Sequence, residues 1–368
     1  MNDDSGRDYW YANVPESDLN SIVDYKECIK SLSDWYVDGG MSKYSSRRQE
    51  LEDNNYDRAW VDAGYQYATK LEKDSMRTVN YLLKEFEMKK SADSYQRTSI
   101  AKTGVLDMLK MHSYKYNEDV FKRITITPGD KNHGLVIFLD WSASMVYQLH
   151  DCYKQLLQIV WFCKRAGIKF EVYAFTDNGW NAFGDKYKLD GSRSSIEDPE
   201  KSPTWKFKHN DMMLGNHLLF NLFSDRMTKN DLIKMVHYLT MLSLSITDRY
   251  SYSHRYGEAV KNPITELLSE EHNDNARFRG VLPVPEGWEL GGTPLNGTII
   301  NAMNFIPKYR NKNGIQNLNI VFITDGASND NANSKVDFSE EAEEGYDRYR
   351  TYPKGSAKTV YHDPVTKK

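Results

Sequence analysis

The chain has 368 residues, 39% hydrophobic and 27% charged, so it is long enough for two domains and can bury a sizeable core. Its net charge of −4 gives no electrostatic reason to expect nucleic acid or an anionic membrane as a partner. Three widely spaced cysteines argue against a disulfide framework and a CxxC metal site, and no apolar segment approaches the ~18 residues of a membrane span. The polar N-terminal segment lacks a signal-peptide pattern, so we expect a cytoplasmic protein.

Residues 1–130 are predicted to form a helical N-terminal region. The segment 17–38 carries apolar residues at spacings of three and four and stops at Gly39-Gly40, which is typical of a helix. The same spacing predicts a second helix over 74–90 and a short third one over 103–114. The charged segment 41–60 between them is expected to be a solvated helix or a loop.

The pattern changes at about residue 131. A continuous apolar run over 134–140 predicts a strand buried on both faces of a parallel sheet. An amphipathic helix over 149–166, with Gly167 as its stop signal, and a second strand over 168–177 follow it. Strand, helix and strand in this order indicate a βαβ unit with a right-handed crossover.

The remaining elements alternate with two polar insertions, predicted at about 178–228 and 248–285. A helix is expected at roughly 229–246, another from Thr293-Pro294 to near Tyr309, and a second apolar strand from Leu318 to Asp325-Gly326. We therefore predict an α/β fold in residues 131–368, with a doubly wound, mostly parallel sheet, behind the helical N-terminal region.

Polar side chains follow the predicted strands at their carboxyl ends, where open α/β sheets bind ligands. Asp140, Ser142 and Ser144 follow the first strand, Thr293 precedes a late helix, and Asp325 ends the late strand. Two carboxylates and three hydroxyls are hard oxygen ligands, so this set suits Mg²⁺, with Mn²⁺ as a substitute, rather than Zn²⁺.

These segments resemble the von Willebrand factor A domain family. "DWSASM" matches its Asp-x-Ser-x-Ser motif, "GGTPLNG" its threonine loop, and "FITDG" its Thr-Asp-Gly strand end. The resemblance implies a Rossmann-like fold with a metal-ion-dependent adhesion site. In such a site Ser142, Ser144 and Thr293 would bind Mg²⁺ directly, and Asp140 and Asp325 directly or through waters. One coordination position would stay open for an Asp or Glu of a partner protein.

The order of elements also looks like the CobT subunit of aerobic cobaltochelatase and like intracellular von Willebrand A proteins that work with MoxR-type AAA+ ATPases. Similar CobT-like proteins occur in large tailed bacteriophages, which would place the protein in the host cytoplasm if it is phage-encoded. The resemblance implies a non-catalytic adaptor for a MoxR- or CobS-like AAA+ ATPase. The chain itself contains no Gly-x-x-x-x-Gly-Lys-Ser/Thr segment for ATP hydrolysis. Its oligomeric state stays open.

Two enzymatic alternatives remain: a subunit of an active metal chelatase, or a phosphohydrolase with Asp140 as nucleophile. The second is disfavoured because such enzymes place another acid two residues on, where this chain has Ser142. The family usually continues with a further strand and a closing helix after the Asp-Gly strand. Here the remaining residues are polar and only Lys358–Tyr361 looks strand-like, so we expect an incomplete C-terminal edge. Trp141 is expected either to pack on the sheet edge or to shape the rim of the site.

Overall fold

A computed structural model describes residues 9–17, 21–38, 56–97, 99–116, 121–126, 132–178, 204–215, 217–253, 262–264, 284–328, 334–338, 350–351 and 358–362. Its centre is a five-stranded sheet in the order β10-β6-β7-β9-β3. The strands are β3 (Ile22–Val23), β6 (His133–Asp140), β7 (Lys169–Thr176), β9 (Leu218–Ser224) and β10 (Asn317–Ile323). β10, β6 and β7 are parallel, β9 is antiparallel to β7, and β3 is parallel to β9. The predicted α/β class with a mostly parallel sheet is confirmed.

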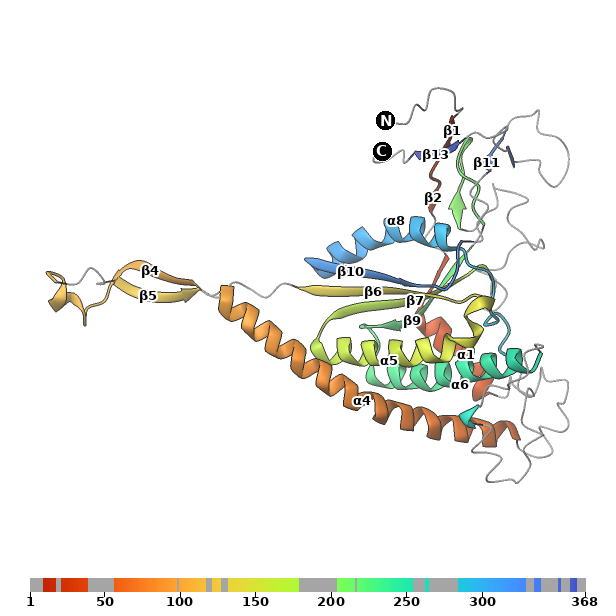
Figure 1. The fold of residues 1–368 in the computed structure, drawn as a ribbon, viewed down its shortest axis with the longest axis horizontal. Coiled ribbons are helices and arrows are strands. Elements are labelled where there is room, and N and C mark those ends of the chain that lie inside the picture. Colours follow the sequence, from red (N-terminus) through yellow and green to blue (C-terminus); the bar gives the residue numbers. More distant parts are fainter. Residues whose placement is uncertain are drawn as a thin grey trace.

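Helices cover both faces of this sheet (Figure 1). One face carries α8 (Leu295–Asn313), and the other carries α5 (Leu149–Ala166) and α6 (Lys229–Ser253). α1 (Tyr25–Tyr36) contacts α6 and β9, and the long α4 (Tyr56–Arg97) packs across α5 and α6. The apolar core is correspondingly split into a larger cluster on the α5–α6 side and a smaller one under α8. No helix of the described residues is long and apolar enough to cross a membrane.

The predicted β6–α5–β7 unit is confirmed. The apolar run of β6 is buried, and α5 ends at Gly167, whose φ of 68° is the left-handed conformation that glycine adopts without strain. The predicted later helices are also present. However, α6 runs on to Ser253 and α8 to Asn313, past the expected end near Tyr309.

The N-terminal region is not a separate helical unit. The helix predicted from residue 17 begins only at Tyr25, because the Asp24 carboxylate accepts the backbone N–H of Lys26 at 3.0 Å as an N-cap. Ile22–Val23 instead extends the central sheet next to β9. The helix predicted over 74–90 is the middle of the 42-residue α4.

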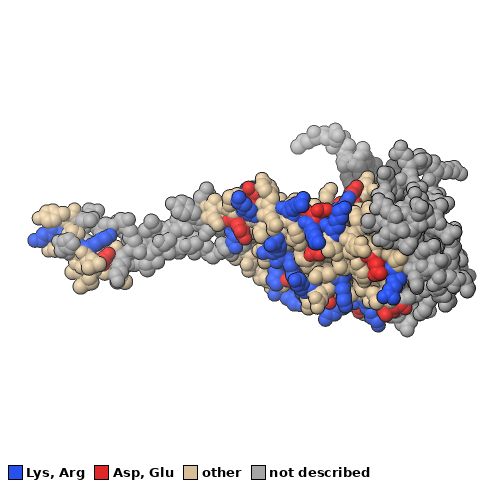
Figure 2. All heavy atoms as spheres, turned by 90° about the horizontal axis from the view of Figure 1, so that it is seen from below, with Lys and Arg blue, Asp and Glu red and all other residues tan. Residues whose placement is uncertain are grey.

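The third predicted helix, over 103–114, is wrong. β4 (Ser99–Leu106) pairs antiparallel with β5 (Phe121–Ile126), and a short 3-10 turn, η2 (Met111–Ser113), lies in the described part of their connection. The segment 121–126 is rich in β-branched residues, and pairing with it overrides the helical spacing. This hairpin projects beyond the end of α4, away from the body (Figures 1 and 2). Its exposed apolar side chains are Val105, Leu106, Met108, Leu109, Met111, Tyr114 and Tyr116.

The predicted insertion over 178–228 contains a strand of the central sheet. All seven residues of β9 are buried, yet Asn221 and Ser224 interrupt its apolar pattern, so the sequence did not predict a strand. The remainder of this segment includes the short β8 (Trp205–Lys206), which pairs with β2 (Glu16–Ser17). Most of the second predicted insertion, 248–285, lies outside the described residues.

The C-terminal segment adds no strand to the central sheet among the described residues. The predicted strand exists as β13 (Lys358–His362), but it pairs with β1 (Tyr9–Asn13). β11 (Lys335–Val336) pairs with β12 (Arg350–Thr351). β10 is therefore an edge strand, and Ile320 and Val321 remain 44% and 40% exposed.

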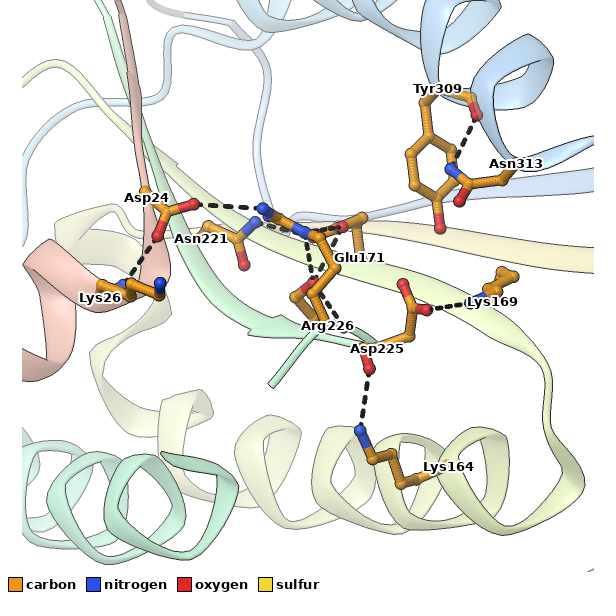
Figure 3. A network of polar contacts seen from close by, with 11 residues as sticks. Asp24, Lys26, Lys164, Lys169, Glu171, Asn221, Asp225, Arg226, Tyr309 and Asn313 are labelled. Carbon is orange, nitrogen blue, oxygen red and sulfur yellow. Dashed lines mark hydrogen bonds and ion pairs between the residues drawn. The ribbon is translucent and has the colours of Figure 1, made fainter. Parts of the chain in front are cut away.

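A partly buried ion pair on the sheet holds the N-cap of α1 (Figure 3). Glu171 Oε1 accepts bonds from Arg226 Nε at 3.2 Å and from Ser224 Oγ at 2.9 Å, and its Oε2 accepts one from Asn221 Nδ2 at 2.7 Å. Arg226 Nη1 also reaches Oδ2 of Asp24, the cap of α1, at 3.4 Å. The polar residues that break the apolar pattern of β9 thus satisfy a carboxylate inside the sheet.

Candidate metal site

Three chain segments converge at the carboxyl end of β6. Trp141 N donates to Phe175 O of β7 at 3.0 Å, which extends the strand pairing by one residue. Ser142 then forms a β-bridge with Gly291: Ala143 N donates to Gly291 O at 2.9 Å, and Gly291 N donates to Trp141 O at 3.1 Å. The loop before α8 therefore lies directly beside the loop after β6.

Four of the five predicted site residues make side-chain contacts in two groups, which meet at residues 324–325 after β10. Thr324 Oγ1 donates to Asp140 Oδ2 at 2.6 Å, so β6 and β10 are joined at this end. The hydroxyl oxygens of Ser142 and Ser144 lie 3.0 Å apart, and Ser144 Oγ donates to Asp325 Oδ1 at 2.8 Å.

Thr293, the fifth predicted residue, is buried two residues after Gly291. Its carbonyl oxygen accepts a bond from Ser328 Oγ at 3.4 Å, and Ser328 follows the Asp325 loop. Ser328 Oγ also accepts the backbone N–H of Asn296 in the first turn of α8, at 3.2 Å. The loop of Thr293 is thus held between the other two segments, although its hydroxyl makes no hydrogen bond to the described residues.

The residues of the site differ in their exposure to solvent. Asp140 is 0% exposed, whereas Ser144 and Asp325 are exposed to solvent. Burial raises the pKa of the Asp140 carboxyl; the nearby Thr324 and Ser142 oppose this shift, and the negative charge of Asp325 adds to it. Within the described residues Asp140 Oδ1 is buried without a hydrogen-bond partner of acceptable geometry. A bound cation would interact with this oxygen, and it would offset the repulsion between the carboxylates of Asp140 and Asp325.

The donor set decides which cation the residues fit. Within the part of the chain that the structure describes, three or more His, Cys, Asp or Glu side chains nowhere gather in a metal-binding cluster. The carboxyl end of β6 offers two carboxylates and several hydroxyls instead, an oxygen-only set that suits Mg²⁺ or Mn²⁺. An orphaned buried carboxylate oxygen in such surroundings fits a hard cation.

Two supporting residues were not predicted from the sequence. Thr324 stands in the "FITDG" segment itself, one residue before Asp325. Asp177 follows β7 at the same end of the sheet, and its Oδ1 accepts the N–H of Gly292 at 2.6 Å. Both residues could have been predicted, because the predicted set was chosen as polar residues at the carboxyl ends of strands.

Trp141 packs inside the protein, so the expectation that it shapes the rim of the site is wrong. It is 3% exposed, its indole N–H donates to the Trp288 carbonyl at 3.0 Å, and the two indole rings meet edge to face. Trp288 in turn donates to Ser31 Oγ on α1 at 3.1 Å. The loop after β6 is thereby anchored to the layer of helices beneath it.

Gly291 allows these loops to approach one another, and we expect Gly291→Ala to disrupt them. An added Cβ would collide with Asp177 Oδ1 and lie 2.7 Å from Thr176 Oγ1, so both neighbours must move. The expected loss is about 1–3 kcal/mol of unfolding free energy, measured by urea denaturation, together with weaker Mg²⁺ binding. Gly326→Ala is the matched control, because its Cβ would meet no atom within 4 Å. Equal stability of the two variants would contradict this account.

Comparisons with family models, with curated proteins and with solved structures found no match. The resemblance to the von Willebrand factor A family therefore depends on the three motifs and on the geometry that brings them together.

Proposed function

We propose that the chain is a von Willebrand factor A-type interaction module of the cytoplasm, which binds Mg²⁺ at the carboxyl end of β6 and is not itself a catalyst. The observation that carries this proposal is the buried Asp140 carboxylate. One of its oxygens has no hydrogen-bond partner of acceptable geometry among the described residues, the other accepts the Thr324 hydroxyl, and the neighbouring Asp325 adds a second carboxylate from the same segment as Thr324. Such an arrangement is costly without a cation.

Ser142, Ser144 and Thr293 would hold the ion directly, and Asp140 and Asp325 directly or through water. When bound, Mg²⁺ would supply an electrophilic position that attracts a carboxylate of another protein. The chain's own residues determine where that happens. Asp140 is fixed by Thr324 and excluded from solvent, while Ser144 and Asp325 stand at the exposed rim where a partner can arrive.

The partner that we propose is a MoxR- or CobS-like AAA+ ATPase offering an Asp or Glu. The support for it is the CobT-like order of elements and the absence of a nucleotide-binding Gly-Lys-Ser/Thr loop in the sequence. ATP hydrolysis would then belong to the partner. A phosphohydrolase is disfavoured further, because a nucleophile must reach its substrate and Asp140 has no exposed surface.

The metal is tested first, with Mn²⁺ as a spectroscopic probe. Electron paramagnetic resonance titration of the full chain is expected to show one bound Mn²⁺, released by an excess of Mg²⁺. Weak, non-stoichiometric binding that Mg²⁺ leaves unchanged would refute the whole proposal.

Partner capture is tested second, with a purified MoxR-type ATPase immobilised on a sensor surface. We expect binding in Mg²⁺ that EDTA reverses and that a Ser144→Ala variant weakens at least about tenfold, since a metal ligand is lost. Capture that persists in EDTA would show that the two proteins meet elsewhere. ATP-dependent metal insertion by this chain together with the ATPase, in a reconstituted chelation assay, would instead favour the chelatase-subunit alternative.

A further inference from the structure

A cavity lies at the opposite end of the sheet from the candidate metal site. It encloses about 310 Å³ between the C-terminal half of α8 and the strands β3, β7 and β9. Its wall includes Tyr173 and Phe305, and its charged groups are three acids and three bases: Asp24, Glu171 and Asp225, and Arg226, Lys308 and Lys312. Glu171 lies near the start of β7, and the candidate metal site lies beyond its end.

The carboxylates of this cavity already have partners. Glu171 accepts three hydrogen bonds through its two oxygens, including one from Arg226. Asp225 Oδ2 is paired with Lys169 Nζ at 2.7 Å (Figure 3). Asp24 caps α1 and meets Arg226. This network explains how the acids are accommodated, and it accounts for Arg226 as a structural residue.

Three donors of α8 that line the cavity have no partner among the described residues: Lys308, Tyr309 and Lys312. Lys308 and Lys312 are exposed, make no ion pair with the described residues, and stand four residues apart, where like charges on a helix repel. The Tyr309 hydroxyl is buried and makes no hydrogen bond within the described part of the chain. Its side chain points toward Glu171 and Asp225 (Figure 3). Burial is the main cause of its raised pKa, followed by these two carboxylates, so the hydroxyl keeps its proton and can donate.

We propose that this cavity binds a small aromatic acid. Its anionic group, a carboxylate or a phosphate, would lie at the rim between Lys308 and Lys312 and relieve their repulsion. The ring would lie against Phe305 and Tyr173, and an acceptor atom at the inner end would receive the hydrogen bond of Tyr309. The ion pair between Glu171 and Arg226 does not account for the two unpaired lysines, the Tyr309 hydroxyl or the volume of the cavity. A small aromatic acid would interact with both lysines and the hydroxyl and would fill the cavity.

The test uses the full chain in EDTA, so that its outcome is independent of the proposed Mg²⁺ site. Calorimetric titrations compare 4-hydroxybenzoate and 4-hydroxyphenyl phosphate, which separate the carboxylate from the phosphate source, with neutral benzamide and cationic benzylamine. We expect saturable binding of at least one acid and none of the two controls. Tighter binding of benzylamine than of either acid, or no binding of either acid, would overturn the proposal.

Variants then locate the site. Lys308→Ala/Lys312→Ala is expected to weaken binding of the acid at least about tenfold, because charge-assisted hydrogen bonds are lost. The matched control is Lys84→Ala/Lys89→Ala, which removes the same charge from the exposed face of α4. Equal weakening by both pairs would show that only net charge matters and would refute the assignment.

Tyr309→Phe separates ligand binding from a structural role. It removes a buried hydroxyl without a partner, so the free variant is expected to unfold at the same temperature as the wild type or higher. The upward shift of that temperature caused by the acid is nevertheless expected to shrink. An unchanged ligand-induced shift would mean that the hydroxyl does not contact the ligand.

Discussion

Replacing Asp140 with asparagine is expected to lower the affinity for Mg²⁺ by at least about 100-fold without unfolding the protein. Loss of residues that only support metal ligands costs about 10–100-fold, and Asp140 would contribute charge to the ion itself. Asparagine keeps the size of the side chain and an acceptor for the Thr324 hydroxyl. Isothermal titration of metal-free protein with Mg²⁺ measures the change. Equal affinities of the variant and the wild type would remove Asp140 from the site.

The same substitution has a second signature in the pH dependence of stability. Burial raises the pKa of Asp140 in the folded protein, so the folded state holds this proton more tightly than the unfolded chain does. The stabilisation is therefore present at low pH and is lost as the pH rises through the folded-state pKa. Without metal, this loss is expected in wild type and reduced in Asp140→Asn, measured by thermal unfolding between about pH 4 and pH 8. Mg²⁺ should restore stability only to the wild type.

Arg226→Met is expected to cause the largest loss of stability, about 2–3 kcal/mol in urea denaturation. Removing one partner of a buried ion pair leaves the other charge uncompensated, at a cost of about 3–5 kcal/mol. The expected loss lies at or below the lower end of that range because the Arg226 side chain is 48% exposed, although its partner Glu171 is only 3% exposed. Asn221 and Ser224 continue to donate to Glu171 in the variant.

The pH response identifies the cause of this loss. Burial already raises the pKa of Glu171, against the opposing effect of Arg226, and loss of the guanidinium should raise it further. The variant should therefore recover stability as the pH falls, because a protonated Glu171 needs no counter-charge. Glu171→Gln in the same chain should restore part of the loss at neutral pH. Arg77→Met, at an exposed position of α4, is the control and should change stability little.

The elements that the sequence predicts well are those with long, uninterrupted apolar patterns, such as β6, α5 and β7. β9 is equally buried, but its two polar residues serve a carboxylate of the neighbouring strand, and a single strand read alone does not show that partner. β3 consists of only two residues, whose spacing also fits the helix that follows. Pairing between distant segments decides these cases, and local patterns do not encode it.

The candidate site was more accessible to sequence reasoning than the fold around it. Its residues lie in three short motifs, each next to a predictable strand or helix end. The sequence does not reveal that these residues differ in solvent exposure: Asp140 is buried, while Asp325 is exposed. That difference arises from the bridge between Ser142 and Gly291 and from the packing of Trp141, both of which depend on residues about 150 positions apart.

The length of α4 has a consequence for how the chain could be engaged by other molecules. Its 42 residues span about 63 Å at 1.5 Å per residue, and the hairpin with its exposed Met, Leu and Tyr side chains stands beyond one end (Figure 1). The candidate metal site lies at the carboxyl end of β6, the end turned away from this hairpin (Figure 1). Two molecules bound at these places would not exclude one another sterically. A single partner could gain affinity by binding both places only if it were long enough to span the distance between the hairpin and the candidate metal site.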